Sequence, residues 1–271
     1  MTNMKQVAKR WLRQATTATT WDTLQYIYWL WLKDTYWYRS RVGRKSARRL
    51  GSFHNQHKGQ RCFIIGNGPS LKQMDLNPLR NEFTFGLNRI YLLFSELSFA
   101  TTYLVSVNRL VIDQSASEIS ALQIPKFIDW RSRGVVDFDE HTIFLRSRYG
   151  RLGFSTNPSS YIYQGATVTY VALQLAYYMG FKDVYLIGVD HNFVTKGTPH
   201  KEIVSTGSDP NHFSGEYFGK GFRWQLPDLE TSEMAYRLAR EAFEQDGRQI
   251  MDATVGGKLK VYPKVQYRDL F

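Results

Sequence analysis

The sequence predicts an α/β fold, Rossmann-like, with a mainly parallel sheet that carries helices on both faces. Two observations predict it. From residue 61 onward, short β-branched and aromatic runs alternate with segments of helical pattern, which is typical of parallel strands joined by helical crossovers. The first run, at residues 62–65, leads directly into a glycine-rich turn at residues 66–70. A strand, a glycine-rich turn and a helix start together form a common phosphate-binding unit.

The predicted elements follow one another to the end of the chain. Seven strands are expected, at residues 62–66, 83–87, 101–106, 126–130, 142–146, 183–188 and 248–251. Five helices are expected, at residues 69–80, 89–96, 115–121, 165–180 and 229–246. The segment 192–228 has five glycines, three prolines and no clear element. Such a long loop inside a compact domain is usually functional, so we expect it to form a lid.

The 271 residues are predicted to divide into two parts. Residues 1–59 are expected to form a basic, aromatic-rich helical arm, and residues 60–271 are expected to form the Rossmann-like domain with its lid. Residues 1–60 hold 12 Lys and Arg against 2 Asp, so +10 of the net charge of +11 lies in the arm. The polar segment 51–60, which contains two glycines, is expected to be a linker.

The arm combines aromatic and cationic side chains. It holds five of the seven tryptophans, and residues 21–38 show the apolar spacing of a helix. This composition is typical of a membrane interface beside anionic lipid, so we expect residues 1–50 to bind an anionic membrane surface. Packing on the domain or on another subunit is the alternative. We expect no nucleic-acid binding, because the rest of the chain is nearly neutral and carries no recognised nucleic-acid motif.

The composition also bounds the cellular setting. The single cysteine, Cys62, cannot form an internal disulfide, which favours a reducing compartment. The sequence shows no secretory leader and no uncharged apolar stretch of about 18 residues, so no transmembrane helix is expected. We therefore expect a cytoplasmic protein, peripheral on the inner face of the cytoplasmic membrane, and leave formation of a homo-oligomer open.

The glycine-rich turn is the first candidate site. Gly66 and Gly68 permit a tight turn and a close approach of backbone to a ligand. Ser70 is a candidate helix cap or phosphate donor. The turn matches neither the GxGxxG pattern nor the P-loop pattern, and a tight turn without a ligand is the alternative interpretation.

A second candidate site lies within residues 165–190. Ala166 and Thr167 open a predicted helix, and the strand that follows this helix ends at Gly188 and Asp190. Ligands of open α/β sheets bind at the carboxyl ends of the strands, so Asp190 and the amides at the helix start are assigned to the site. A carboxylate that caps a helix or orders a loop is the alternative interpretation of Asp190.

Three more polar residues follow predicted strands or lie in the lid. Asn88 and Asn108 each come where a strand gives way to a loop. An amide offers a donor and an acceptor without charge, which suits base or ribose recognition, although turn formation is an equal alternative. His212 lies in the lid, where an imidazole beside a nucleotide can act as a general base near neutral pH. An ordinary polar histidine is the alternative.

Metal binding is also considered. Asp190, His191, His200 and His212 are residue types that bind metals. Their spacing matches no standard zinc pattern, and no acidic pair suited to a Mg²⁺-nucleotide is present. We therefore expect a metal-independent protein without a cofactor.

The order of these motifs resembles that of a known family. The motifs that carry the resemblance are Gly66-Asn67-Gly68-Pro69-Ser70-Leu71-Lys72, Asn88, Asn108, the helix start at 165–167, Gly188-Val189-Asp190 and Asn211-His212-Phe213. They occur in the order seen in bacterial sialyltransferases of glycosyltransferase family 42. The layout also resembles the broader DUF115, or MptE-like, family, which includes motility-associated flagellin glycosyltransferases and archaeal 6-hydroxymethylpterin diphosphokinases. Residues 252–257, Asp-Ala-Thr-Val-Gly-Gly, are similar to the Asn-Ala-Thr-x-Gly-Gly tail of DUF115 proteins.

The resemblance covers residues 60–271 and implies a function. It implies inverting transfer of a nonulosonic-acid-type sugar, sialic acid or Kdo-like, from a CMP-activated donor to a glycan or lipid-linked acceptor of the cell envelope. His212 would match the general base, and Asn67, Ser70, Asn88 and Asn108 would match contacts to cytidine, phosphate and sugar. The sialyltransferases place tyrosines just after the Ile-Asp strand end. Here His191, Lys196 and His200 occupy this segment, as candidates to stabilise the leaving phosphate.

Two other functions stay open at this stage. One is an ATP- and Mg²⁺-dependent diphosphokinase that acts on a pterin-like alcohol. The other is a non-catalytic nucleotide-binding component of a polysaccharide assembly complex.

Overall fold

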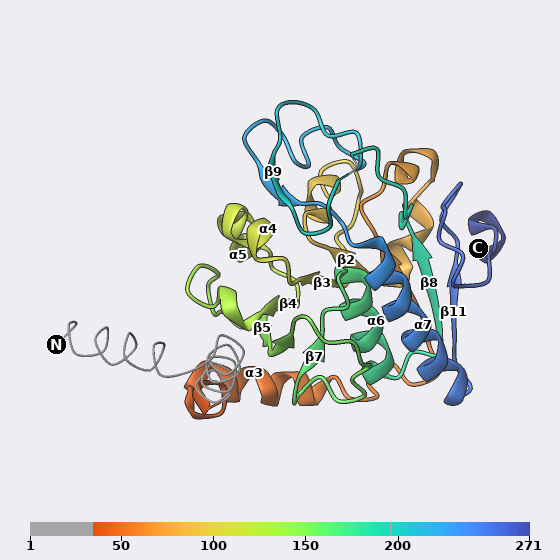
Figure 1. The fold of residues 1–271 in the computed structure, drawn as a ribbon. Coiled ribbons are helices and arrows are strands. Elements are labelled where there is room, and N and C mark those ends of the chain that lie inside the picture. Colours follow the sequence, from red (N-terminus) through yellow and green to blue (C-terminus); the bar gives the residue numbers. More distant parts are fainter. Residues whose placement is uncertain (1–34, 196) are drawn as a thin grey trace, which may run out of the picture. The chain divides into compact units, whose positions relative to one another are not determined.

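A computed structural model describes residues 35–195 and 197–271 (Figure 1). The chain forms two compact units, Met1–Lys45 and Ser46–Phe271. Most of the helix predicted over residues 21–38 lies outside the described residues, but residues 35–39 are helical. None of the helices within the described ranges has the length and apolar character that crossing a membrane requires.

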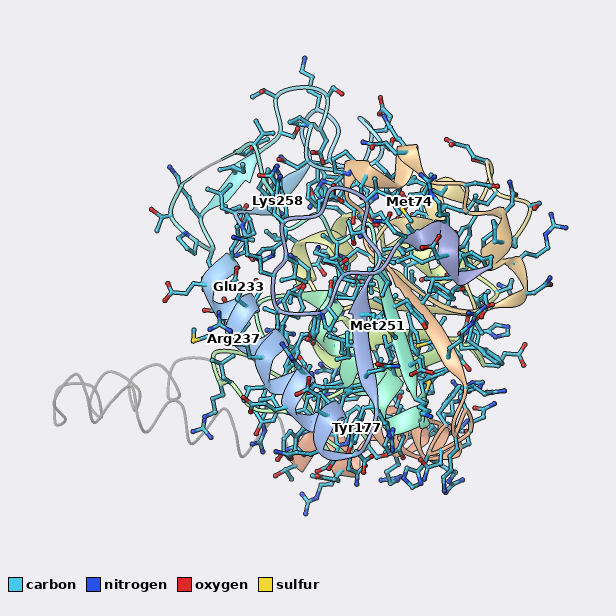
Figure 2. All side chains as sticks on the ribbon, turned by 90° about the vertical axis from the view of Figure 1, so that its right-hand side faces the viewer. Met74, Tyr177, Glu233, Arg237, Met251 and Lys258 are labelled. Carbon is cyan, nitrogen blue, oxygen red and sulfur yellow. The ribbon has the colours of Figure 1, made fainter. Side chains whose placement is uncertain are left out.

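A seven-stranded parallel sheet forms the centre of the second unit. Its strands are β1 (Arg61–Ile65), β2 (Phe83–Leu87), β3 (Tyr103–Ser106), β4 (Lys126–Asp129), β5 (Thr142–Leu145), β8 (Asp183–Ile187) and β11 (Gln249–Asp252). The strand order is β11-β8-β1-β2-β3-β4-β5, and every pair is parallel. Met251 marks the edge strand β11 in Figure 2. The predicted fold class is confirmed, and each predicted strand overlaps an observed one.

The strands are covered on both faces because their side chains alternate between two apolar layers. Cys62 and Ile64 of β1 face the cluster that contains α6 (Val168–Met179), whereas Phe63 and Ile65 are buried outside that cluster. This alternation follows from the two-residue period of a strand. Figure 1 shows α6 and α7 (Leu229–Gln245) on the same face of the sheet. Ten of the twelve residues of α6 are buried.

The remaining elements are short. They are α3 (Arg41–Ser52), α4 (Arg109–Gln114), α5 (Ala116–Ala121), the 3-10 helices η1 (Pro69–Gln73), η2 (Asn77–Asn81), η3 (Ile90–Leu93), η4 (Trp130–Ser132) and η5 (Tyr267–Leu270), and the strands β6 (Ser147–Arg148), β7 (Ile162–Tyr163), β9 (Glu202–Val204) and β10 (Arg223–Gln225). The antiparallel pair of β9 and β10 lies within the predicted lid. In Figure 1 the segment that contains β9 lies beyond the ends of the strands toward which β8 points.

Two helix predictions were wrong in detail, and one helix was missed. The helix predicted at 89–96 is only the short 3-10 helix η3 at Ile90–Leu93. The continuous helix predicted at 69–80 is two short 3-10 helices, η1 and η2. Pro78 has no backbone N–H and restricts the residue before it, so an α-helix does not continue through this point. A helix at 109–114, which the prediction missed, begins after Asn108, whose side chain accepts hydrogen bonds from the amides of Leu110 and Val111.

The segment 51–60, expected as a linker, is a turn packed on the domain. The amides of Asn55, His57 and Gly59 donate to the carbonyls of Tyr178, Met179 and Gly180 at the end of α6. His57 is buried, and its ring stacks on Phe181. The turn therefore closes the amino end of the sheet, and its polar residues are used for packing and hydrogen bonding.

The strand order determines where a ligand can bind. The chain runs outward from β1 to β5 and then returns to place β8 on the other side of β1. The loops after β1 and β8 thus leave the sheet in opposite directions. In parallel sheets such a switch point leaves a crevice at the carboxyl ends of the strands, where ligands bind.

Candidate functional site

A cavity of about 700 Å³ lies at the carboxyl ends of the strands. Its walls come from the loops after β8, β1, β2 and β3, from the start of α6 and from the lid. The predicted site residues that line it are Gly66, Asn67, Gly68, Asn88, Asn108, Ala166, Thr167, Gly188, Asp190, His191, His200 and His212. Ser70 is buried and is not part of the lining, and Lys196 lies outside the described residues. A volume of this size is ordinary for a small-molecule site.

The glycine turn is tied to the loop after β8. The amide of Gly68 donates to the carbonyl of Gly188 at 2.8 Å. A Cβ atom at Gly66 would overlap the carbonyl of Gly188, and one at Gly68 would overlap the carboxylate of Asp190. Both glycines are therefore needed for the close packing of these two loops. The turn leads into the five-residue 3-10 helix η1, where an α-helix was expected.

Asp190 orders the glycine turn. Its carboxylate accepts hydrogen bonds from the Ser70 hydroxyl at 2.7 Å and from the Ser70 amide at 3.2 Å. Burial raises the pKa of Asp190, and the hydrogen bonds from Ser70 counteract this shift. The geometry matches the loop-ordering alternative for Asp190 and makes Ser70 its supporting donor, although Asp190 also lines the cavity.

Asn67 has an unused acceptor. Its side-chain Oδ1 is buried and has no hydrogen-bond partner among the described residues. An acceptor of this kind is rare in native structures because its desolvation is not offset. The backbone carbonyl of Asn67 accepts from the amide of Phe213 at 2.8 Å, which joins the glycine turn to the lid.

The asparagines after β2 and β3 both have structural partners. Asn88 adopts the left-handed region with φ 48°, and its Oδ1 accepts from the Ser106 hydroxyl. Asn108 caps α4. Each side chain thus uses its oxygen within the protein while lining the cavity. At the start of α6, Ala166 has φ 57° and Thr167 is the N-cap.

His212 is held by a carboxylate and an aromatic ring. Its Nδ1 lies 2.6 Å from Oδ2 of Asp209, and its ring stacks on Tyr217 at 4.0 Å and 10°. An ionised carboxylate only accepts, so Nδ1 carries the hydrogen and Nε2 carries the lone pair. No described residue forms a hydrogen bond with Nε2. The pair can therefore take a proton at Nε2 while Asp209 stabilises the resulting charge.

His191, just before the lid, and His200, within it, also lie against carboxylates. His191 Nε2 lies 3.0 Å from Oε1 of Glu233, near the start of α7 (Figure 2), and His200 Nε2 lies 3.2 Å from Oδ2 of Asp228. Thr231 and His200 lower the pKa of Asp228 by hydrogen bonding, against the opposing effect of burial. Within the parts of the chain that the structure describes, no group of three or more His, Cys, Asp or Glu is placed to hold a metal ion.

Two functional candidates were missed from the sequence. Asp209 precedes His212 by three residues in a turn, and this spacing was a usable signal. Arg131 follows β4 and lines the cavity. Its position after a predicted strand end was a signal too, but Ser147 and Gln164, which donate to its partner Asp129, lie far away in the sequence.

These features define the class of the protein: a Rossmann-like α/β protein with a switch-point cavity. A family model described as 6-hydroxymethylpterin diphosphokinase MptE-like matches residues 42–196, more than half of the chain. The chain therefore belongs to the MptE-like family, as its motifs predicted. No curated protein matches the chain.

Two solved structures are similar to the chain. The MAf glycosyltransferase from Magnetospirillum magneticum AMB-1 matches with a TM-score of 0.50 at 13% identity, over 86% of this chain and 39% of that chain. The chain thus spans about two fifths of that protein and shares its fold. A mammalian sialyltransferase, in complex with Gal-beta-1-3GalNAc-ortho-nitrophenol, matches with a TM-score of 0.37 at 11% identity, over 86% of this chain and 85% of that chain.

Proposed function

We propose that this chain is an inverting, metal-independent glycosyltransferase that moves a nonulosonic acid from a CMP-activated donor to a hydroxyl group of a cell-envelope glycan. The observation that carries the proposal is the Asp209–His212 pair, whose histidine lines the same cavity as the glycine turn at the switch point. MAf, a protein of the same fold, is a glycosyltransferase. The motif order shared with family 42 sialyltransferases supports the CMP-activated donor.

The proposed reaction needs one base and one site for the leaving group. An acceptor oxygen forms a bond to the anomeric carbon while the bond from that carbon to the CMP phosphate oxygen breaks. The electron pair of the breaking bond goes to the phosphate, and the acceptor proton goes to Nε2 of His212. Attack from the face opposite to the phosphate inverts the anomeric configuration.

The cavity offers one amide side chain and two imidazole rings to the donor. Asn67 presents a buried acceptor without a partner, which suits a donor group of the nucleotide. His191 and His200 line the cavity and are proposed to hold the leaving phosphate, because hydrogen-bond donors aimed at a developing negative charge lower the barrier. Lys196 keeps this proposed role, although it lies outside the described residues.

Metal independence is supported by how the acidic groups are used. Asp190 accepts from Ser70, and Asp209 binds His212. Asp228 accepts from Thr231 and His200. A Mg²⁺-nucleotide would need carboxylates with free oxygens, and these three are already engaged.

The family description favours a second candidate, a diphosphokinase that transfers pyrophosphate from ATP with Mg²⁺ to a pterin-like alcohol. A thermal-shift screen separates the two functions. The full chain is heated with CMP, CDP, UDP, GDP or ATP, each with Mg²⁺ and with EDTA. The transferase proposal predicts selective stabilisation by CMP in EDTA. Stabilisation by ATP only when Mg²⁺ is present would contradict it and favour the diphosphokinase.

We further propose that the arm holds the protein at an anionic membrane surface, where a lipid-linked or envelope acceptor would be available. In its described part, exposed basic and aromatic side chains follow one another: Tyr36, Tyr38, Arg39, Arg41, Arg44 and Lys45. Cations beside aromatic rings are typical of interfacial helices. The test is flotation with anionic liposomes. Replacement of Arg41, Arg44 and Lys45 by Gln should weaken flotation, and undiminished flotation would contradict the proposal.

A further inference from the structure

A fixed arginine lies at the end of the cavity away from the switch point. Arg131 donates through Nε to Oδ1 of Asp129 at 2.9 Å and through one terminal nitrogen, Nη2, to Oδ2 at 2.9 Å. This two-point contact fixes the plane of the guanidinium. The other terminal nitrogen has no partner among the described residues, and Arg131 is one of the residues that line the cavity.

The carboxylate of Asp129, which binds this arginine, accepts hydrogen bonds on both of its oxygens. Asp129 is buried with 1% of its side chain exposed, and it also accepts from the Arg131 amide, the Ser147 hydroxyl and the Gln164 side-chain amide. Its neighbour Trp130 is buried against Phe144. Three of these five donors belong to Arg131, and the other two fix the carboxylate, so the guanidinium is held in one orientation. Burial lowers the pKa of Arg131, but hydrogen bonding to Asp129 and the negative charge of that carboxylate together raise the pKa above its ordinary value.

The topology separates this arginine from the glycine turn. Three strand spacings lie between β1 and β4. At about 4.8 Å for each spacing, Asp129 lies roughly 14 Å along the sheet edge from the glycine turn. His212 lies nearer to β1 and β2, because Phe213 binds the carbonyl of Asn67 and the Tyr217 hydroxyl lies beside the Arg89 amide. His212 and the glycine turn thus lie toward β1 and β2, whereas Arg131 follows β4.

We propose that Arg131 binds an anionic group of the acceptor, a carboxylate or a phosphate, and so makes the protein selective for acidic acceptors. The inference rests on the proposed function. If the nucleotide donor binds at the switch point, the part of the cavity beside Arg131 is left for the acceptor. The acceptor hydroxyl reaches Nε2 of His212 while its anionic group contacts the free edge of the guanidinium. A planar guanidinium suits either anion.

The test uses the full chain, saturated with CMP, and three probes: glucose, glucuronate and glucose 6-phosphate. Their dissociation constants are measured by ligand-observed NMR on the wild type, Arg131→Gln, Arg131→Lys and the control Arg133→Gln. The control removes the same charge two residues away, at an exposed position that does not line the cavity. Gln and Lys at position 131 both keep a hydrogen-bond donor for Asp129. A thermal melt of each variant shows whether it is folded, and the binding comparison uses the folded variant. The CMP dissociation constant is measured for each protein.

The proposal predicts that at least one anionic probe binds the wild type more tightly than glucose. This preference should fall roughly ten- to hundredfold in Arg131→Gln, less in Arg131→Lys and not in Arg133→Gln. Which probe is preferred identifies the anion as carboxylate or phosphate. Equal binding of all three probes, or a preference that survives in Arg131→Gln, would overturn the proposal. Failure of CMP to bind, with an Arg131-dependent preference intact, would instead refute the proposed donor and keep the anion site.

Discussion

Histidines at the two ends of the sheet lie in opposite environments. At the amino end, His57 has uncharged partners: its ring nitrogens contact Gln60 and the hydroxyl of Tyr103, and the ring stacks on Phe181. At the carboxyl end, His191, His200 and His212 each lie against a carboxylate and line the cavity. Burial lowers the pKa of His57, which keeps this ring neutral.

This difference shows that the partner of a histidine, and not its presence in a polar segment, indicates its use. A neutral ring between a tyrosine and a phenylalanine holds a turn in place. A ring that donates to a carboxylate keeps its second nitrogen as a base and can carry the charge it gains.

Loss of the proposed base should have the largest effect. In His212→Ala, the rate of CMP release from CMP-N-acetylneuraminic acid in the presence of an acceptor should fall by about 10²–10⁴-fold, because general-base catalysis is lost. The CMP dissociation constant should stay the same. His57→Gln is the matched control and should keep the rate. Near-normal turnover in His212→Ala would remove this residue from the role.

A methyl group in the glycine turn should separate the loops after β1 and β8. In Gly68→Ala the added carbon meets the carboxylate of Asp190, so we expect a loss of about 1–3 kcal/mol in the free energy of unfolding. Stabilisation by CMP should also weaken. Gly134→Ala adds the same methyl group where no atom lies within 4 Å and serves as the control in denaturant melts. Equal stability of the two variants would show that the turn does not need this packing.

Loss of the hydroxyl that hydrogen-bonds to Asp190 should have a smaller effect on stability. Ser70→Ala removes the hydroxyl that donates to this carboxylate at 2.7 Å. We expect a loss of about 1–2 kcal/mol in the free energy of unfolding, since the buried acceptor loses one charge-assisted partner. Ser117→Ala, at an exposed contact with Glu118, should change stability by less than about 0.5 kcal/mol. A Ser70→Ala variant as stable as wild type would mean that solvent replaces the hydroxyl.

The contribution of His57, at the amino end of the sheet, to stability should depend on pH and should not depend on ligand binding. Burial lowers the folded pKa of His57 below its ordinary value of 6.5, so the unfolded chain binds a proton more readily. The stability that neutral His57 contributes is complete above pH 6.5 and is lost as the pH falls toward the folded pKa. The limit for one group is about 1.4 kcal/mol per pH unit. Urea melts between pH 7 and pH 5 should show a steeper loss for wild type than for His57→Gln, and parallel curves would contradict this.

The comparison also explains which parts were predictable from the sequence. The strands were predicted well because each is a local buried run, such as Phe63 to Ile65, that needs no distant partner to be seen. The helix at 69–80 was mispredicted because Pro78 outweighs the apolar spacing around it. His57 was assigned to a linker because Tyr103 and Phe181, which bury it, lie far along the chain.

The structure places most of the candidate residues at one cavity, but their bonding was not predictable. Parallel strands bring their carboxyl ends together, which is why residues that follow different strands meet there. The hydrogen bond from Ser70 to Asp190 joins two different loops. The position of Arg131 also depends on distant segments, because its partner Asp129 is bonded to Gln164, which in turn is bonded to Ser147. Such contacts have no periodic signal in one sequence.

One measurement tests the central claim most directly: the ring signals of the six histidines in a nitrogen-15 NMR spectrum during a titration with CMP in EDTA. Single His→Gln variants assign the signals. The account predicts that the His212 ring shows an Nδ1–H tautomer and shifts on titration, together with His191 and His200, while His57 does not change. A His212 signal that stays fixed while CMP binding is saturated would contradict the assignment of this cavity as the donor site.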